Sequence, residues 1–215
     1  MGQIAPPPIR PDTFDPLVAA LADDLAGTFE RVVLTHQDRL FTFALRLCGD
    51  RRDAEEVTQD TFVRAYRALL TYDVARIRAL ALRPWLYRIT LNLARNRLRG
   101  RAAAPLPLPE EHRDEGHVAA TPPLQARAED GPEQVAERAE LSDRLAATLD
   151  TLPPRYRTAL LLRHVAGLSY PEVAAALTLP AGTVKAQVHR GVALLRTAWL
   201  AHNALAHDTK EYDDD

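Results

Sequence analysis

Long polar side chains gather in two segments of the chain, where they could bind a partner. Residues 181–191 read AGTVKAQVHRG and hold four such side chains, Lys185, Gln187, His189 and Arg190. Basic side chains bind phosphates, while amide and guanidinium groups pair with base edges in the major groove of DNA. Because that groove admits one α-helix, the segment predicts a DNA-reading helix. The alternative is an ordinary helical hairpin with a solvated basic face.

The second segment is a basic helix with aromatic and amide side chains. Residues 83–101 hold six arginines and no acid, interleaved with Trp85, Tyr87, Asn92 and Asn96. Arginines bind phosphates, aromatic rings stack on unpaired bases and amides read base edges, which is the chemistry of single-stranded DNA binding. The alternative is a solvated basic helix whose Trp85 and Tyr87 pack in the core, where aromatic residues of helices usually lie.

A third polar surface is expected on the helix that begins near Asp53, for which Asp53 is a candidate cap. One side of this helix carries residues suited to a core at helical spacing, namely Ala54, Val57, Thr61, Ala65 and Leu69. The opposite side carries Glu56, Gln59, Asp60 and Arg64. The pattern predicts an exposed, mixed polar face.

The sequence predicts no enzyme, no metal site and no cofactor. The seven histidines are scattered, no HExxH motif occurs, and no glycine-rich phosphate loop or nucleophile motif is present. The single cysteine, Cys48, fits a small buried residue in a reducing compartment. No signal peptide or membrane span is predicted, so we expect a cytoplasmic protein that does not insert into a membrane.

The elements around residues 181–191 follow a helix-turn-helix plan. A helix over LDTLPPRYRTALLLRHVAG precedes Ser169 and Glu172, which are spaced as a capping box. A short helix, the turn TLPAG and a longer helix follow, which is typical of DNA-binding helix-turn-helix motifs. Val184, Val188 and Leu195 form one stripe, predicted to pack on the preceding helix. The neighbouring stripe, predicted to be exposed, holds Lys185, Ala186, His189, Arg190 and Ala193.

Composition divides the chain into two helical blocks, and no strand pattern appears. Residues 102–135 hold six prolines and a net charge of −5, and residues 208–215 carry −4. Because the whole chain carries −2, these two segments leave +7 on the remainder. We therefore predict an all-α fold: two small helical domains joined by a flexible, Pro-rich, acidic linker, the C-terminal domain being a helix-turn-helix.

Three segments, in this order, resemble bacterial RNA polymerase sigma factors: DAEEVTQDTFVRAYRAL, RPWLYRITLNLARNRLR and LPPRYRTALLLRHVAGLSYPEVAAALTLPAGTVKAQVHRGVALLR. The similarity covers nearly all of residues 27–198 and is narrowest to the extracytoplasmic-function group, which keeps only regions two and four. With the composition, it predicts the following organisation: a disordered extension (1–16), a region 2 domain (17–101), a linker (102–135), a region 4 domain (136–200) and an acidic tail (201–215), and the tail has no counterpart in the family.

The resemblance also implies partners: core RNA polymerase, promoter DNA as duplex and melted strand, and an anti-sigma factor of the kind that often silences this group. Docking on core polymerase would fall to Glu56, Gln59, Asp60 and Arg64. The minus-ten element would meet Arg83, Trp85, Arg88, Asn92, Arg95, Asn96 and Arg99. The minus-thirty-five element would meet Thr183, Lys185, Ala186, Gln187, His189 and Arg190. Because Gln187 and His189 depart from the usual basic or serine residues, no promoter preference carries over.

A competing hypothesis is a transcriptional regulator with an N-terminal sensing or interaction domain and the same C-terminal helix-turn-helix. The two hypotheses differ in the first block. A sensing domain has no need of an arginine-aromatic helix beside a face of carboxylate and glutamine side chains, so the first block favours the sigma factor.

Overall fold

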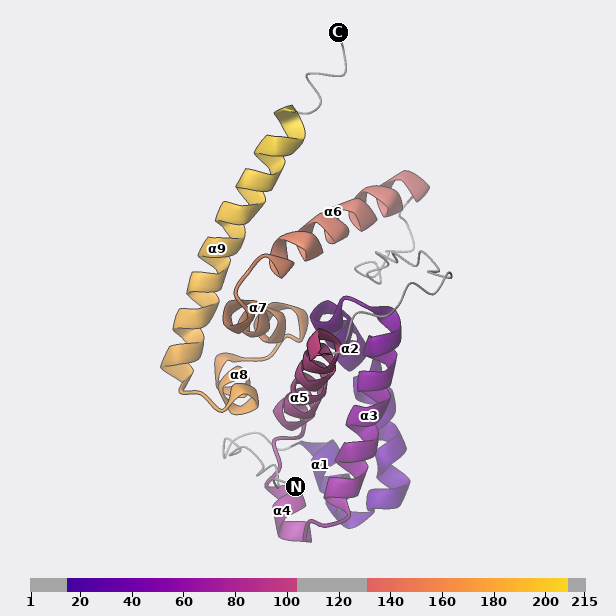
Figure 1. Cartoon of the computed structure of the whole chain (residues 1–215). Helices are drawn as coiled ribbons and strands as arrows, with labels where there is room; N and C mark the ends of the chain where they lie inside the picture. Colours follow the sequence, from indigo (N-terminus) through magenta and orange to yellow (C-terminus); the bar gives the residue numbers. More distant parts are fainter. Residues whose placement is uncertain (1–14, 104–130, 209–215) are drawn as a thin grey trace.

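A computed structural model describes residues 15–103 and 131–208 of the 215-residue chain. Figure 1 shows two groups of helices, coloured indigo to magenta and orange to yellow, that lie against each other. Within the described residues there are helices and no strands. The predicted all-α fold is confirmed.

The N-terminal domain is built from helices that mostly start at an aspartate. Its elements are α1 (Pro16–Asp23), α2 (Leu25–Cys48), α3 (Arg51–Leu69), α4 (Val74–Arg78) and α5 (Leu82–Ala103). Four helix starts are capped by the carboxylate of Asp15, Asp24, Asp50 or Asp73, each accepting a backbone N–H of the first turn. For α3 the expected cap was Asp53. That prediction is wrong, because the helix begins earlier and Asp50 caps it.

The core of this domain lies between α2, α3 and α5, which pack against one another. The prediction for α3 is confirmed: Ala54, Val57, Thr61, Ala65 and Leu69 are all buried. Phe43 of α2 and two aromatic residues of α5, Trp85 and Tyr87, are buried with them. Most of the long α2 and the first half of α5 therefore serve to hold α3 and the rest of α5 in place.

The C-terminal domain contains α6 (Pro132–Asp150), α7 (Pro154–Leu160), a π-helical turn η1 (Leu161–Val165), α8 (Tyr170–Leu177) and α9 (Ala181–Asp208). Gly167 ends the α7–η1 segment at φ +66°, a left-handed conformation that glycine adopts without steric cost. The capping box is confirmed: the Ser169 hydroxyl accepts from Glu172 N–H, and the Glu172 carboxylate accepts from Ser169 N–H. The helix-turn-helix is thus α8, the turn at Thr178, and α9.

Several element bounds differ from those expected. Helix α5 runs to Ala103 and α6 starts at Pro132, so both ends of the predicted linker are helical. Helix α9 continues to Asp208, past the predicted domain end at residue 200. The rest of the predicted linker (104–130), the end of the tail (209–215) and nearly all of the N-terminal extension (1–14) lie outside the described residues.

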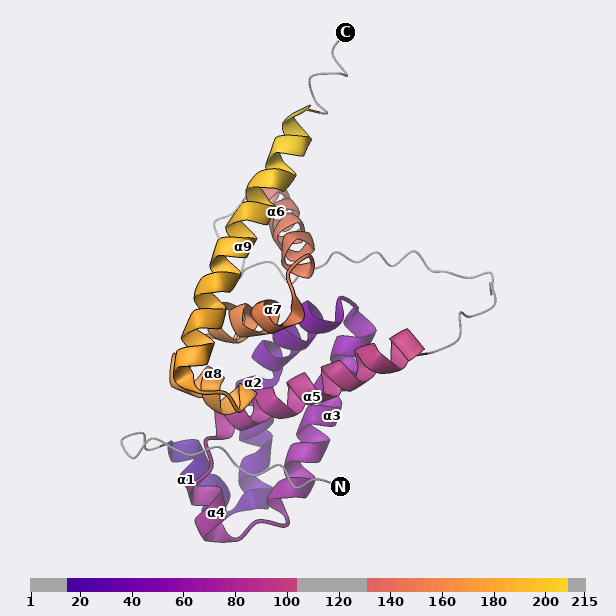
Figure 2. The same cartoon turned by 60° about the vertical axis from the view of Figure 1, so that its left-hand side comes forward.

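The two domains touch mainly through α8 and η1, with further hydrogen bonds from Arg46 of α2 to α6 and from α7 to Arg46. Helix α8 packs against α5, and η1 packs against α2. Figures 1 and 2 both show α8 beside α5, and Figure 2 shows the second half of α5 extending away from the C-terminal domain. The sequence left this arrangement open, because two domains on a flexible linker can take many relative positions.

Candidate nucleic-acid interface

Helix α3 presents a polar face opposite its buried side. Gln59, Asp60 and Arg64 are exposed on it, as predicted from their helical spacing. Val63, which the sequence reasoning did not include, is also exposed among them. Because Val63 precedes Arg64 in the sequence and lies outside the apolar stripe, its position could have shown that it belongs to this face. The face therefore combines a carboxylate, an amide, a guanidinium and an apolar side chain, which is a composition suited to binding another protein.

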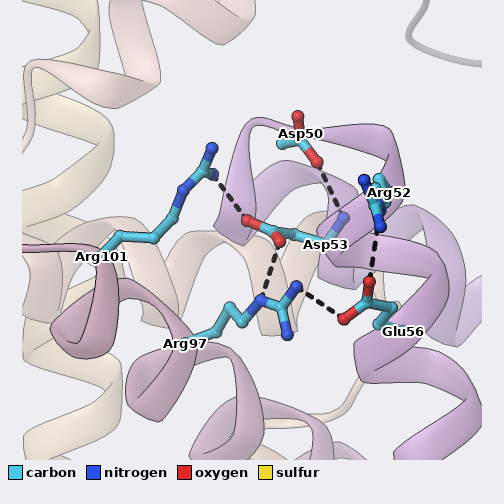
Figure 3. Close-up of polar contacts among 6 residues, drawn as sticks. All are labelled: Asp50, Arg52, Asp53, Glu56, Arg97 and Arg101. Atoms are coloured by element: carbon cyan, nitrogen blue, oxygen red, sulfur yellow. Dashed lines mark hydrogen bonds and ion pairs between the residues drawn. The ribbon is translucent and has the colours of Figure 1, made fainter. Parts of the chain in front are cut away.

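The fourth predicted residue of this face, Glu56, faces α5 instead of open solvent. Figure 3 shows its carboxylate between two guanidinium groups. Arg97 of α5 lies 2.6 Å from one carboxylate oxygen and Arg52 lies 3.4 Å from the other. Glu56 is half-buried. Its carboxylate thus binds the basic helix of its own domain.

Asp53 is the centre of this charge cluster (Figure 3). Its side chain is only 7% exposed, and its two carboxylate oxygens accept from Arg97 Nε at 2.8 Å and Arg101 Nη1 at 2.6 Å. The hydrogen bond to Asp53 raises the pKa of Arg97. Asp53 therefore holds the second half of α5 against the start of α3. Two of the six arginines of α5 make this contact, which the sequence did not predict.

The aromatic side chains of α5 lie in the core. Trp85 is 0% exposed and its ring centroid lies 6.1 Å from that of Tyr72. Tyr87 is 1% exposed and packs edge-on against Phe43 at 5.1 Å. The assignment of Trp85 to DNA stacking is therefore wrong for this structure. The alternative interpretation, that both aromatic residues belong to the core, describes it.

Four of the predicted minus-ten residues form one exposed stripe on the second half of α5. They are Asn92, Arg95, Asn96 and Arg99, at steps of three and four residues. Arg99 donates a hydrogen bond to the amide oxygen of Asn96. The stripe offers two amides and two guanidinium groups to one side of the helix, which is the composition expected of a surface for phosphates and base edges.

The remaining two predicted minus-ten residues, Arg83 and Arg88, lie on the first half of α5 and face the C-terminal domain. Both are half-buried and hydrogen-bonded to backbone carbonyls there. Burial lowers the pKa of Arg88. The structure thus divides the predicted set into an exposed stripe, a covered pair and a buried tryptophan.

Helix α9 presents the other candidate DNA surface. The predicted packing stripe is confirmed, since Val184 and Val188 are buried and Leu195 packs against the same core. Next to it, Thr183, Lys185, Ala186, His189 and Arg190 are exposed, while Gln187 is half-buried. The face therefore has long basic side chains separated by a small one, which lets a helix approach the floor of the major groove.

Gly191 sets how closely α9 approaches α7. A Cβ built there would lie 3.0 Å from Leu160 Cγ and 3.4 Å from Tyr156 Cβ. A larger residue would therefore have to push the Leu160 side chain aside. This contact fixes the orientation of the reading face with respect to the rest of the C-terminal domain.

Two kinds of site are missing from residues 15–103 and 131–208. No three His, Cys, Asp or Glu side chains come together there as metal ligands would. Nor does any helix of these residues combine the length and the apolar run that crossing a bilayer takes.

Comparison with known proteins gives the family. The sigma-70 region 2 family matches residues 32–104, and the sigma-70 region 4 family matches residues 142–195. The first match covers most of the N-terminal domain and the second covers the helix-turn-helix. Because a region 2 domain is not a sensing domain, the competing hypothesis of a regulator does not fit the chain.

Curated relatives and a solved structure agree with this result. The ECF RNA polymerase sigma factor SigE of Mycolicibacterium smegmatis is 35% identical over 82% of this chain and 63% of its own length. SigW of Bacillus subtilis is 32% identical over 78% of this chain and 87% of its own length. The structure of CnrH in complex with the cytosolic domain of CnrY superposes with a TM-score of 0.61 at 29% identity, covering 86% of this chain and 96% of that chain.

The fold and the matched regions define a sigma factor with regions 2 and 4. The chain belongs to the extracytoplasmic-function group of sigma-70 factors, the DNA-recognition factors of transcription initiation. In this family the two regions bind core RNA polymerase and promoter DNA.

Proposed function

We propose that this chain directs core RNA polymerase to promoters through three surfaces: the polar face of α3, the exposed stripe of α5 and the reading face of α9. The observation that carries the proposal is the position of the two basic faces. They lie on helices of two different domains, each opposite a buried apolar side. A protein that reads two promoter elements needs two such faces.

The α3 face docks on core polymerase. Gln59, Asp60 and Arg64, with Val63 between them, form a mixed polar and apolar surface that is exposed in the described part of the chain. Glu56 borders this surface and is already paired with Arg97 and Arg52. We therefore assign Glu56 a supporting role at the edge of the docking face.

The exposed stripe of α5 binds the melted strand of the minus-ten element. Asn92 and Asn96 can pair with base edges, and Arg95 and Arg99 can bind phosphates on either side. Arg83 and Arg88 extend this surface toward the start of α5 when the C-terminal domain does not cover them. Trp85 supports the helix from the core and takes no part in binding.

The α9 face reads the minus-thirty-five element as duplex. Lys185, His189 and Arg190 reach bases or phosphates, and Ala186 permits close approach. Thr183 lies in the first turn of α9, where backbone N–H groups point toward a DNA phosphate. Gln187 stands beside the buried stripe and contacts the edge of the site.

Catalysis belongs to the polymerase, and this chain contributes recognition alone. We place it in the cytoplasm, where core polymerase and promoter DNA are found. The solved relative CnrH is bound to the cytosolic domain of CnrY. By this similarity we propose that the present chain also binds a protein partner, and that this partner is the anti-sigma factor that the family resemblance implies.

The docking face is tested by reversing one charge. We expect Asp60→Arg to weaken binding to core polymerase by about 1–3 kcal/mol, the contribution of a desolvated polar contact. Because Asp60 is exposed, helix content and melting temperature should not change. Asp38→Arg, at an exposed position of α2, is the matched control. A pull-down in which Asp60→Arg retains wild-type binding would remove α3 from the docking surface.

A further inference from the structure

Two arginines proposed for minus-ten binding are occupied by the C-terminal domain. Arg83 donates to the carbonyl oxygen of Ala166 at 2.5 Å, and its Nη1 lies 3.9 Å from a carboxylate oxygen of Glu172. Arg88 donates to the carbonyl oxygens of Ala175 and, from Nε at 3.2 Å, Ala176. The region 4 domain thus supplies the acceptors that DNA phosphates would otherwise supply.

The acceptors of Arg88 lie at the end of α8. The last carbonyls of a helix have no partner within the helix, and they carry the negative end of its dipole. A guanidinium group satisfies them with the same N–H groups that bind phosphate. The Nε and Nη2 groups of Arg88 that donate to the end of α8 are therefore not open to a DNA phosphate in this arrangement.

A second contact between the domains lies away from every residue assigned to DNA. Arg46, in the last turn of α2, donates to the Ser142 hydroxyl of α6 at 2.9 Å, and Arg157 of α7 donates to the Arg46 carbonyl oxygen at 2.5 Å. Burial lowers the pKa of Arg46, and the carboxylates of Asp143 and Asp150 on α6 oppose that shift. Arg46 is thus a basic residue of region 2 that faces two acids and one arginine, Arg157, of region 4.

The reading face of α9 is not involved in either contact. Lys185, His189 and Arg190 are exposed while α8 lies on α5. The contact between the domains therefore affects the exposure of the two DNA-binding surfaces differently. It covers part of the minus-ten surface and leaves the minus-thirty-five surface open.

We infer that the free chain closes on itself, with α8 of region 4 occupying Arg83 and Arg88 of region 2, so that these two arginines join the minus-ten surface only when the domains separate, whereas minus-thirty-five binding needs no separation. This inference rests on the proposed function, since it assigns those arginines to the minus-ten surface. Arg46 and its acidic neighbours stabilise the closed form. Because they lie away from the DNA-binding residues, a substitution at Arg46 leaves those residues unchanged.

The test opens the closed form at Arg46 in the full chain. Arg46→Glu places a carboxylate beside Asp143 and Asp150, and Arg46→Ala removes the guanidinium group without adding charge. Arg31, exposed on the same helix, provides the matched controls Arg31→Glu and Arg31→Ala. The probes are a fluorescein-labelled single-stranded DNA of mixed sequence and the duplex of the same sequence, read by fluorescence anisotropy, with X-ray scattering to follow compactness.

If about a tenth of the free molecules are open and only these bind with full affinity, closure weakens the apparent affinity of the chain for single-stranded DNA about tenfold. We therefore expect Arg46→Glu to bind single-stranded DNA about tenfold more tightly than Arg31→Glu. Its radius of gyration should also exceed those of wild type and the control. Duplex binding should be equal in the two reversed variants, because the reading face is exposed in both forms. Arg46→Ala should likewise bind single-stranded DNA more tightly than Arg31→Ala, by a smaller factor. If Arg46→Glu fails to fold, the comparison of the two alanine variants is the test.

Equal single-strand affinities in the Arg46 and Arg31 variants would overturn the inference, whether or not the scattering changes. A wild-type chain as expanded as Arg46→Glu would also overturn it. These results are distinguishable from failure of the proposed function. A chain that yields promoter-dependent transcripts with core polymerase, yet shows no difference between the variants, keeps the proposed function and loses only the closed form.

Discussion

Asp53 joins the start of α3 to the second half of α5, and replacing it with alanine should loosen that junction. Both carboxylate oxygens of Asp53 accept from arginines, at 2.8 and 2.6 Å, and the side chain is 7% exposed. A hydrogen bond to a charged group contributes about 1.5–3 kcal/mol when it is buried. Here the arginines are 41% and 57% exposed, so both can regain water when the carboxylate is removed, and the loss is smaller than two buried bonds would give.

We therefore expect Asp53→Ala to lower the free energy of unfolding by about 2 kcal/mol. For a domain of this size that corresponds to a fall of about 8–16 °C in its melting temperature. Asp60→Ala is the matched control, since it makes the same substitution at an exposed position of the same helix and should cost less than about 0.5 kcal/mol.

Differential scanning calorimetry of the full chain measures both variants. The reasoning is refuted if Asp53→Ala melts within about 2 °C of Asp60→Ala, a difference of well under 1 kcal/mol. A shift that is smaller than expected in Asp53→Ala, but larger in an Asp53→Ala, Arg97→Ala, Arg101→Ala triple variant, would mean that the guanidinium groups find other partners when the carboxylate is removed.

Three further predictions concern α9, its support and the thiol. Arg190→Ala should cost about 1–3 kcal/mol and relax preference at one position of the upstream element if Arg190 reads a base, whereas an equal loss on all duplexes in an anisotropy titration would mean a phosphate contact. Gly191→Ala should destabilise the C-terminal domain in urea, because its Cβ would lie 3.0 Å from Leu160 Cγ, while Ala193→Ser at an exposed site should be neutral; an unchanged urea midpoint for Gly191→Ala would show that α9 shifts freely. Burial raises the pKa of Cys48 to about 11, so the thiol stays protonated at pH 8. It should react slowly with a disulfide reagent in the native chain and fast only after unfolding, and rapid reaction of the native chain would contradict its burial.

Local chemistry in the sequence was enough to predict the helix-turn-helix. The capping box at Ser169 and Glu172 and the valine stripe of α9 depend on residues three or four apart, and all are found as predicted. The same holds for the buried side of α3. These features are set by hydrogen bonds within one turn and by helical periodicity, which a single sequence displays.

Periodicity could not show how far along α5 its neighbours extend. Trp85, Arg88, Asn92 and Asn96 recur on one stripe of the helix, so their spacing suggested one surface. In the structure, Trp85 is covered by the core beside Tyr72, and Arg88 is covered by α8. Only the second half of the stripe is exposed, because α5 extends beyond its neighbours there.

Pairings between distant residues were also out of reach. Asp53 and Arg97 are far apart in the chain, and an aspartate at a helix start is more often a cap than a buried ion-pair partner. Helical spacing placed Glu56 on the exposed face, and the family resemblance assigned that face to docking, whereas an ion pair with Arg97 holds Glu56 against α5. The contact of Arg83 and Arg88 with region 4 depends on how two domains meet, about which the sequence of neither domain carries a local signal.

Promoter-dependent transcription tests the central proposal most directly. The purified chain is mixed with core RNA polymerase and fragmented genomic DNA, and the starts of the transcripts are mapped. We predict a set of starts that share two upstream elements, absent with core polymerase alone and absent with an Asn92→Ala, Asn96→Ala variant that keeps core binding. Transcripts that are the same with and without the chain, although the chain binds core polymerase, would contradict the assignment of α5 and α9 to promoter recognition.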